Sequence, residues 1–512
     1  MRHPVLVAAL AVAALSAAGT PGRAQDAHAS ADTGAKPVPA ESASVTHHTV
    51  TIDGTPIAYS ATAGTLLVRN DSGDPTGSFF YVAYTKDGAE PRTRPVTFLY
   101  NGGPGSSTIW LHMGSFAPVR VVTTDAGSTP PAPYDLKANP YSLIDKTDLV
   151  FIDAMGTGFS RVVGKGQGKD FYGVDQDIAA FADVITRYVT VNNRWNSPKF
   201  LLGESYGTTR SAGLADVLDD RGMPLNGVIL VSSYLNAYVD FPGPAFSLEI
   251  SYPLYLPTMA ATAWYHDKLS PKPADLAAFL AEVRQFALGD YLHALTQGSH
   301  LGAAERDAVV AKLHAYTGIS ADYWRAANLR LTPDRFEKEL LRGDRRTTGR
   351  LDSRFVGIDH DAAGETPEND PADVAINGPF TTAFNAYLAN ELHYQSDRRY
   401  LTTNYPVVGD DWDNHHRVEG QKWPLPDVSA DLREAMEKNP NLKVFSANGY
   451  FDFATPFFET EYTLSHMGLD PSLEKNITYG YYQSGHMIYL HTPALVELKR
   501  DLARFYDGVL AR

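Results

Sequence analysis

A serine, Ser205, lies between two glycines, Gly203 and Gly207, directly after the apolar run 200–202 and before a segment with helical spacing. Glycines at these positions let a strand turn sharply into a helix, because side chains there would keep the two elements apart. Such a turn exposes the serine hydroxyl and holds its backbone at strained angles. The pattern predicts that Ser205 is the nucleophile of an acyl-transfer site. An ordinary serine in a tight turn is the alternative interpretation.

A serine hydroxyl becomes a good nucleophile only when a base removes its proton, and that base is usually a histidine oriented by a carboxylate. In a strand, turn and helix of this kind the chain order is serine, acid, histidine. Asp452 follows the apolar run 444–447, and His486 follows the run 477–482. We therefore expect Asp452 and His486 to complete a triad with Ser205. The weaker candidates for the same roles are Asp470, His466 and His491.

A glycine-rich turn follows the apolar run 96–100, with the sequence Asn101-Gly102-Gly103-Pro104-Gly105-Ser106-Ser107. Backbone N–H groups aimed at the oxyanion of an acyl-transfer intermediate are each worth ~10²- to 10³-fold in rate. We expect the N–H groups of Gly103 and Tyr206 to have this role. A phosphate-binding loop would need Gly-Lys-Ser/Thr, which is absent here. The glycines of 164–168 fail as well, because Asp170 takes the place of the hydroxyl residue.

Six short apolar runs, separated by longer segments with helical spacing, predict parallel strands that are covered by helices on both faces. The runs are 96–100, 149–152, 200–202, 228–231, 444–447 and 477–482. Ahead of them, alternating segments at 45–52, 57–62 and 79–85 predict antiparallel strands. The fold class is therefore α/β, with a doubly wound, mostly parallel sheet. Its ligand site should lie at the carboxyl ends of the strands, where the predicted site residues fall.

Residues 240–405 have a different character and are predicted to form a mainly helical insertion. Apolar residues keep helical spacing over 276–286 and 384–392, and Thr332 and Pro333 provide an N-cap and a first-turn proline for a further helix. The predicted α/β core is then 45–239 together with 406–512. An insertion at this point should form a cap over the catalytic edge of the sheet.

The first 24 residues read as a secretory signal peptide, and 25–44 as a flexible linker poor in large apolar residues. A membrane anchor is less favoured, because the apolar run is shorter than the ~20 residues that span a bilayer. We expect a periplasmic or extracellular protein with no membrane span after signal removal. The chain has no cysteine, so packing alone must stabilise it, and a bacterial origin is favoured. The net charge of −15 opposes binding to nucleic acid.

Several motifs in order along the chain together resemble the serine carboxypeptidase family. They are Asn101-Gly102-Gly103-Pro104-Gly105-Ser106-Ser107, Asn139-Pro140-Tyr141-Ser142, Phe151-Ile152-Asp153 with Gly156-Thr157-Gly158-Phe159-Ser160, Gly203-Glu204-Ser205-Tyr206-Gly207, and Gly485-His486-Met487. The resemblance implies an α/β-hydrolase fold and a secreted enzyme that needs no cofactor. Its substrate would be a peptide with a free C-terminus, whose last residue is released through an acyl-enzyme. Asn101 and Glu204 would then bind the terminal carboxylate.

The chain departs from the family pattern at two positions beside this site. Leu99 stands where the family usually has tryptophan, and no acid occurs near Ser115, where a second acid should share a proton with Glu204. A pair of carboxyls that shares a proton accepts a carboxylate mainly at acidic pH. We therefore expect altered carboxylate recognition, with an arginine from the cap, and a less pronounced acid optimum. The family's usual disulfides are also absent.

Two other functions remain open for the same residues. An esterase or acyltransferase would use the same triad with a different acceptor, and a catalytically inactive peptide-binding module would keep only the fold. The presence of Ser205, Asp452 and His486 argues against the inactive module. The stretch 410–416 has the composition of a metal site, although a polar loop explains it better, and no metal is expected.

Overall fold

The computed structural model describes residues 36–240, 242 and 249–511. These residues belong to one compact unit that begins at Lys36. The predicted signal peptide, 1–24, lies outside the described residues, as does 25–35 of the predicted linker. The rest of that linker makes contacts with the fold, because Lys36 pairs with Gly164 and the first strand begins at Ala43. The folded region therefore begins earlier than residue 45, where the sequence analysis places it.

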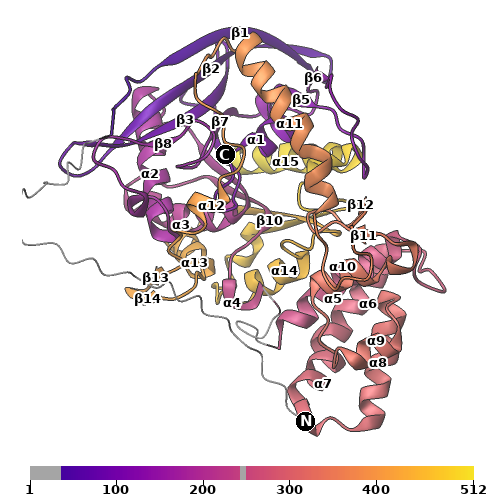
Figure 1. Cartoon of the computed structure of the whole chain (residues 1–512). Helices are drawn as coiled ribbons and strands as arrows, with labels where there is room; N and C mark the ends of the chain where they lie inside the picture. Colours follow the sequence, from indigo (N-terminus) through magenta and orange to yellow (C-terminus); the bar gives the residue numbers. More distant parts are fainter. Residues whose placement is uncertain (1–35, 241, 243–248, 512) are drawn as a thin grey trace, which may run out of the picture. The chain divides into compact units, whose positions relative to one another are not determined.

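A ten-stranded mixed sheet forms the centre of this unit (Figure 1). Its order is β1 (Ala43–Ile52), β2 (Thr55–Arg69), β3 (Pro75–Lys86), β7 (Asp148–Ile152), β4 (Val96–Tyr100), β9 (Lys199–Ser205), β10 (Gly227–Ser233), β15 (Lys443–Gly449) and β16 (Ile477–Tyr482), with β8 (Arg161–Val162) paired to β3. The strands β7, β4, β9, β10, β15 and β16 run parallel to one another, whereas β1, β2 and β3 are antiparallel to their neighbours. The predicted mostly parallel sheet with N-terminal antiparallel strands is confirmed.

The parallel strands other than β16 are buried on both faces, which is why their sequences are almost continuous apolar runs. The edge strand β16 is half exposed, so the prediction that 477–482 is covered on both faces is wrong. In β9, Phe200 and Leu202 belong to one core cluster, and Leu201 belongs to the cluster on the opposite face. In β4, Leu99 lies in the first cluster and Phe98 in the second. This alternation follows from the two-residue period of a strand. Two separate cores therefore sandwich the sheet.

The helices that cover the sheet divide between these two cores. The core containing Leu201 is closed by α2 (Val174–Val191), α3 (Tyr206–Asp220) and α13 (Ser429–Lys438). The opposite core is closed by α1 (Ile109–Leu111), the π-helical turn η1 (His112–Phe116), α11 (Pro371–Asn390) and α15 (Thr492–Leu510). Covering helices on both faces are the arrangement that the doubly wound pattern predicts. No helix within 36–240 or 249–511 is both long enough and apolar enough to cross a membrane.

A third apolar core lies within the predicted insertion. Its helices are α5 (Ser251–Tyr265), α6 (Leu276–Phe286), α7 (Leu292–Gln297), α8 (Ala303–Thr317), α9 (Ala321–Ala326) and α10 (Pro333–Glu339), which gather outside the sheet in Figure 1. Phe451 and Phe457 of the α/β core complete this cluster, the latter from α14 (Phe457–His466). Pro333 opens α10 as predicted, but the Thr332 side chain makes no cap hydrogen bond.

The predicted insertion does not behave as one body, because α11 packs on the sheet instead of joining the third core. Its residues Ile376, Phe380 and Phe384 belong to the cluster that covers the sheet. Helical spacing predicts that a helix has an apolar face, but not which surface that face meets. The remaining elements are α4 (Ala237–Asp240), α12 (Tyr405–Val408) and three two-stranded ribbons: β5 (Val119–Val121) with β6 (Leu136–Ala138), β11 (Thr347–Thr348) with β12 (Val356–Gly357), and β13 (His416–Val418) with β14 (Gln421–Trp423).

Candidate active site

The turn around Ser205 joins β9 to α3 at the carboxyl edge of the sheet. Ser205 has φ 62° and ψ −134°, and Tyr206 is the first residue of the helix. A positive φ on a residue with a side chain costs about 1–3 kcal/mol, so the surroundings must enforce it. A Cβ atom added to Gly203 would lie 2.1 Å from the carbonyl oxygen of Gly207, so the strand and the helix can approach only around glycine. The predicted strand, sharp turn and helix are all present.

Asp452 and His486 lie in the loops that follow β15 and β16. Nδ1 of His486 is 2.8 Å from Oδ2 of Asp452, and the two residues are only 3% and 1% exposed. The backbone N–H groups of Ala454 and Thr455 donate to Oδ1 of Asp452 at 2.8 and 3.0 Å, and the Thr455 hydroxyl donates to Oδ2 at 2.9 Å. These donors fix the position and orientation of the carboxylate behind the imidazole. With Nδ1 facing Asp452, Nε2 of His486 is the nitrogen left to take a proton.

The electrostatics of His486 are those of a base paired with an acid. Burial by itself lowers the pKa of His486, but the negative charge of Asp452 and the hydrogen bond to it outweigh burial, so the pKa is raised. The backbone of His486 is also held, because the Ser232 hydroxyl donates to its carbonyl oxygen at 2.7 Å. Ser232 lies at the carboxyl end of β10, so three adjacent strands position this imidazole.

A hairpin loop from the insertion, residues 349–355 between β11 and β12, ties together the loops that carry Asp452 and His486. The N–H of Phe453 donates to the Arg350 carbonyl at 3.0 Å, and the N–H of His486 donates to the Leu351 carbonyl at 2.6 Å. A Cβ atom added to Gly485 would lie 2.4 Å from that Leu351 oxygen, so glycine is required there. The glycine before His486 thus allows the hairpin loop to reach the site.

The rival residues lie elsewhere and have other partners. Asp470 is exposed and accepts from the N–H of Ser472 at 2.8 Å. His466 stacks on Tyr462, with ring centroids 3.9 Å apart. His491 pairs with Asp125 at 2.9 Å. The structure therefore brings Asp452 and His486 together and leaves the three rivals outside the pair.

The glycine-rich turn after β4 packs directly against the start of α3. A Cβ atom added to Gly102 would lie 2.4 Å from the backbone nitrogen of Tyr206. Gly103 has φ 114°, a conformation that side chains oppose, and an added Cβ there would lie 2.6 Å from the Gly105 nitrogen. Tyr206 begins α3, so its N–H has no acceptor within the helix. Gly103 and Tyr206 therefore meet at the wall of the same cavity as Ser205, as a pair of oxyanion donors would.

Two other motif residues, Asp153 and Asn139, hold the segments that follow the glycine-rich turn. Oδ1 of Asp153, which follows β7, accepts from the Thr108 N–H and the Tyr400 hydroxyl, each at 2.9 Å. The side-chain amide of Asn139 donates to the carbonyl oxygens of Ser115 and Ala117, both at 2.7 Å, and so holds η1 in place. These motif residues position the loops of the site instead of lining its cavity.

Asn101 and Glu204 form a buried pair next to Ser205. Nδ2 of Asn101 donates to Oε1 of Glu204 at 2.6 Å, and Oδ1 of Asn101 accepts from the Leu111 N–H at 3.0 Å. Burial raises the pKa of Glu204 to about 7. The second oxygen of Glu204, Oε2, is buried and has no hydrogen-bond partner among the described residues. A buried, unsatisfied carboxyl oxygen in a cavity wall is suited to hydrogen-bond a ligand.

Three residues of this network were not found by sequence reasoning. The Tyr489 hydroxyl donates to Oε1 of Glu204 at 3.2 Å. Arg210 forms a buried ion pair with Asp177 at 2.7 Å and donates to the Asn101 carbonyl at 2.9 Å. No local pattern marks these residues, because the contacts join distant elements: α2 supplies Asp177, α3 supplies Arg210, and the turn before α15 supplies Tyr489.

Two adjoining cavities of about 120 and 190 Å³ open over Ser205. The smaller is lined by residues that include Asn101, Glu204, His486, Trp110 and Tyr405. The larger is lined by residues that include Tyr206, Tyr234, Trp412, Asn414 and Thr455. Both cavities share Gly103, Ser205, Arg350 and Ala454. A ligand can therefore lie on either side of the serine at once, as the two halves of a cleaved bond require.

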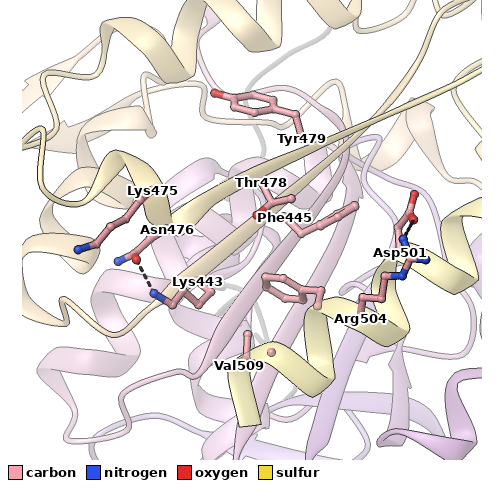
Figure 2. Close-up of a pocket in the computed structure, with 11 residues that line it drawn as sticks. Lys443, Phe445, Lys475, Asn476, Thr478, Tyr479, Asp501, Arg504 and Val509 are labelled. Carbon is pink, nitrogen blue, oxygen red and sulfur yellow. Dashed lines mark hydrogen bonds and ion pairs between the residues drawn. The ribbon is translucent and has the colours of Figure 1, made fainter. Parts of the chain in front are cut away.

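A larger cavity of about 520 Å³ lies between β16 and α15 and contains none of the predicted site residues (Figure 2). Two of its three basic side chains, Lys443 and Arg504, have partners within its wall. Lys443 donates to Asn476, and Arg504 lies 3.9 Å from Asp501. This cavity is not the candidate active site despite its size, because it does not contain Ser205 or the residues that surround Ser205.

The stretch 410–416 is built around ion pairs. His416 bridges Asp175 and Asp431 at 2.6 and 2.9 Å, and so links the β13 ribbon to α2 and α13. His415 pairs with Asp413 at 2.5 Å. Over the part of the chain that the structure describes, no group of three or more His, Asp or Glu residues could hold a metal ion.

The sheet order, the turn at Ser205 and the loops after β15 and β16 define an α/β-hydrolase fold. The prohormone-processing carboxypeptidase of Saccharomyces cerevisiae has the same fold, with a TM-score of 0.52 and 16% identity over 88% of this chain and 91% of that one. This likeness concerns the fold.

The sequence comparisons cover the first half of the α/β core. Residues 55–236 match the family model described as serine carboxypeptidase. Serine carboxypeptidase-like 33 of Arabidopsis thaliana is 26% identical over 148 residues, which are 28% of this chain and 29% of that protein. Serine carboxypeptidase-like 36 of the same plant is 25% identical over 169 residues, 32% of this chain and 33% of that protein. The chain thus matches about a third of the length of these curated relatives, and the matched family segment includes Asn101, Glu204 and Ser205.

Proposed function

We propose that this protein is a serine carboxypeptidase that releases C-terminal residues from peptides. The observation that carries the proposal is the strained Ser205 in one cavity with His486, which pairs with Asp452 behind it, and with the buried Asn101–Glu204 pair. The first pair supplies acyl-transfer chemistry, and the second supplies a place for a terminal carboxylate. The match of residues 55–236 to the serine carboxypeptidase family supports the same conclusion.

In the first half of the reaction, Ser205 Oγ attacks the scissile carbonyl carbon while Nε2 of His486 accepts the hydroxyl proton. The charge of Asp452 stabilises the imidazolium that forms. The N–H groups of Gly103 and Tyr206 donate to the carbonyl oxygen as it becomes an oxyanion. His486 then gives the proton to the leaving nitrogen, the C–N bond breaks, and the C-terminal residue departs. The acyl group remains as an ester on Ser205.

In the second half, a water molecule gives a proton to His486 and attacks the ester carbonyl. The same N–H donors stabilise the second oxyanion. The bond from the carbonyl carbon to Ser205 Oγ breaks, and His486 returns the proton to the serine. The shortened peptide leaves with a new carboxylate.

Labelling with a fluorophosphonate tests the nucleophile. We expect wild-type protein to be labelled at Ser205 and Ser205→Ala to be unlabelled. Failure of the folded wild-type protein to react would overturn the enzyme proposal and favour an inactive peptide-binding module. A blocked dipeptide with a free C-terminus, its amide and its ester then separate a carboxypeptidase from an esterase or acyltransferase. Cleavage of the ester alone would favour the esterase.

We also propose that the protein is exported through the signal peptide predicted at 1–24. The short apolar run and the small residues that end it support this location. Expression of the full chain in a bacterial host, followed by fractionation and N-terminal sequencing, tests it. A periplasmic product that begins near residue 25 is expected, and retention of the intact N-terminus in the cytoplasm would contradict it.

A further inference from the structure

One arginine, Arg350, lies beside the candidate nucleophile and has no role in the steps above. It belongs to the hairpin loop 349–355 and lines both cavities that open over Ser205. Among the described residues that line these two cavities, it is the only lysine or arginine. The site therefore has one permanent positive charge at the point where its two halves meet.

The side chain of Arg350 differs from those of the other arginines near the site. Arg354, four residues away, forms a buried ion pair with Asp352 at 2.6 Å, and Arg210 forms one with Asp177 at 2.7 Å. Arg350 makes no ion pair or side-chain hydrogen bond with another described residue. Nearby acids act on it only by longer-range electrostatic attraction. Its guanidinium is thus left with its donors uncommitted, inside a site that can hold a ligand.

The backbone of Arg350 is held firmly even though its side chain is uncommitted. Its carbonyl accepts from the Phe453 N–H at 3.0 Å, next to Asp452. The following residue, Leu351, accepts from the His486 N–H at 2.6 Å, and its own N–H donates to Oδ2 of Asp370 at 2.8 Å. Arg350 is therefore held at a fixed place relative to the candidate acid and base, as a ligand-orienting residue must be.

The charge around the site makes a cation necessary for an anionic ligand. The smaller cavity is also lined by Glu204 and Asp373, and the chain as a whole carries a net charge of −15. Both acids repel a carboxylate whenever they are ionised. Neither Asn101 nor the Tyr489 hydroxyl that contacts Glu204 brings a positive charge. Arg350 is the one permanently charged cation among the described lining residues that can offset this repulsion.

We infer that Arg350 binds the terminal carboxylate of the substrate and makes the enzyme select peptides with a free C-terminus. The inference rests on the proposed function and adds a specificity-determining residue to it. A guanidinium can hold a carboxylate through two parallel hydrogen bonds, which fixes the orientation of the leaving residue as well as its charge. Arg350 then supplies what a second acid beside Glu204 would have supplied by sharing a proton.

The test compares a blocked dipeptide with a free C-terminus, its amide and its methyl ester as substrates of wild type and Arg350→Gln. We expect kcat/KM for the free acid to fall on the order of 10- to 100-fold, the loss typical of a charged hydrogen bond, mainly through KM. The ester and the amide should change by less than about 3-fold, because they bring no charge to the guanidinium. Arg350→Lys should keep part of the selectivity because the positive charge remains. The rest should be lost, because an ammonium cannot form the two parallel hydrogen bonds of a guanidinium. Arg345→Gln is the matched control and should behave as wild type, because Arg345 is exposed and lies five residues before Arg350, outside the hairpin loop.

The outcomes separate this inference from the function on which it rests. If Arg350→Gln loses activity toward all three substrates and its fluorophosphonate labelling also falls, Arg350 only holds the loops together. That result would overturn the inference. A wild-type enzyme that is labelled but cleaves acid and ester equally would overturn it as well. Absence of labelling in wild type would instead overturn the proposed function. A loss of kcat/KM for the free acid alone, with unchanged labelling of Arg350→Gln, supports both the inference and the proposed function.

Discussion

The hydroxyl of Tyr489 donates a 3.2 Å hydrogen bond to Oε1 of Glu204, next to the position where the family resemblance places a second acid. That position is Ser115, whose hydroxyl bonds instead to the Leu111 carbonyl within η1. The Tyr489 ring occupies the space beside it, because a Cβ atom added to Gly114 would lie 2.5 Å from the ring. A neutral phenol thus takes the place of a carboxyl, and among the described residues Glu204 has no acidic hydrogen-bond partner with which to share a proton.

This arrangement predicts how substrate binding depends on pH. Burial raises the pKa of Glu204 to about 7, so Glu204 is neutral below that pH and negative above it. A neutral Glu204 can donate to a substrate carboxylate, whereas an ionised one repels it. We expect KM for the free-acid dipeptide to rise on the order of 10-fold between pH 6 and pH 8. In Glu204→Gln this rise should disappear, because the amide does not titrate.

Steady-state kinetics at constant ionic strength measure this dependence. The methyl ester is the control substrate, since it carries no terminal charge. The raised pKa of His486 should place the acid limb of kcat/KM above pH 6.5 for both substrates. A sharp optimum below pH 5 would contradict both assignments.

Removal of the charge that faces His486 should reduce catalysis without abolishing the fold. In Asp452→Asn we expect kcat to fall by ~10⁴-fold, the loss known for the same change in another serine enzyme, because the amide favours the wrong tautomer of the imidazole. KM should change little, since Asp452 lies behind His486. Thr455→Val, which removes only the hydroxyl donor to Asp452, should lose about 1 kcal/mol of stabilisation, or about 5-fold in rate. Equal losses in the two variants would contradict the proposed role of Asp452.

The close approach of the hairpin loop 349–355 to Gly485 predicts a strong effect of a single methyl group. In Gly485→Ala the new Cβ would lie 2.4 Å from the Leu351 oxygen and 2.5 Å from the Asp352 Cα, so the loop must move away. We expect kcat/KM to fall at least 100-fold, because shifts on the order of 1 Å in positioning have this cost. Gly508→Ala, in an open position of α15, is the control and should retain full activity. Wild-type rates in Gly485→Ala would show that the loop does not position His486.

The ion pairs of His416 predict a pH dependence of stability. Asp175 and Asp431 raise the pKa of His416 to about 9 against the lowering effect of burial. Because the folded pKa lies above the unfolded value of 6.5, the stabilisation is complete below pH 6.5 and is lost as pH rises through 9. Burial also raises the pKa of Asp431, which offsets part of the gain. We expect a net loss on the order of 2 kcal/mol in the free energy of unfolding across this window.

Urea denaturation at pH 6 and pH 9 measures this loss. His416→Gln should be less stable at pH 6 and should lose less stability between the two values. Glu305→Gln, which removes the exposed carboxylate paired with His293 at 3.5 Å, is the control and should follow wild type. A wild-type free energy of unfolding that is the same at both pH values would contradict the role of His416.

Local patterns in the sequence predict several features of this fold. The apolar runs of β4, β7 and β9 are visible because a strand covered on both faces contains almost nothing else. The turn at Ser205 is visible because its geometry excludes side chains at Gly203 and Gly207. The order of strands along the chain then placed Asp452 and His486 at one edge of the sheet. These features depend on neighbours in the sequence or on a general rule of sheet topology.

The surroundings of Ser205 depend instead on contacts between distant parts of the chain. Arg350 belongs to an insertion that reads as helical, and nothing local shows that its hairpin loop reaches His486. Tyr489 meets Glu204 across 285 positions of the chain, and α11 leaves the other helices of the insertion to cover the sheet. Such contacts follow from how distant surfaces fit together, which neither periodicity nor motif spacing records. The chemistry at Ser205 therefore follows from the local sequence. The substrate group that the site binds depends on how the surrounding elements pack.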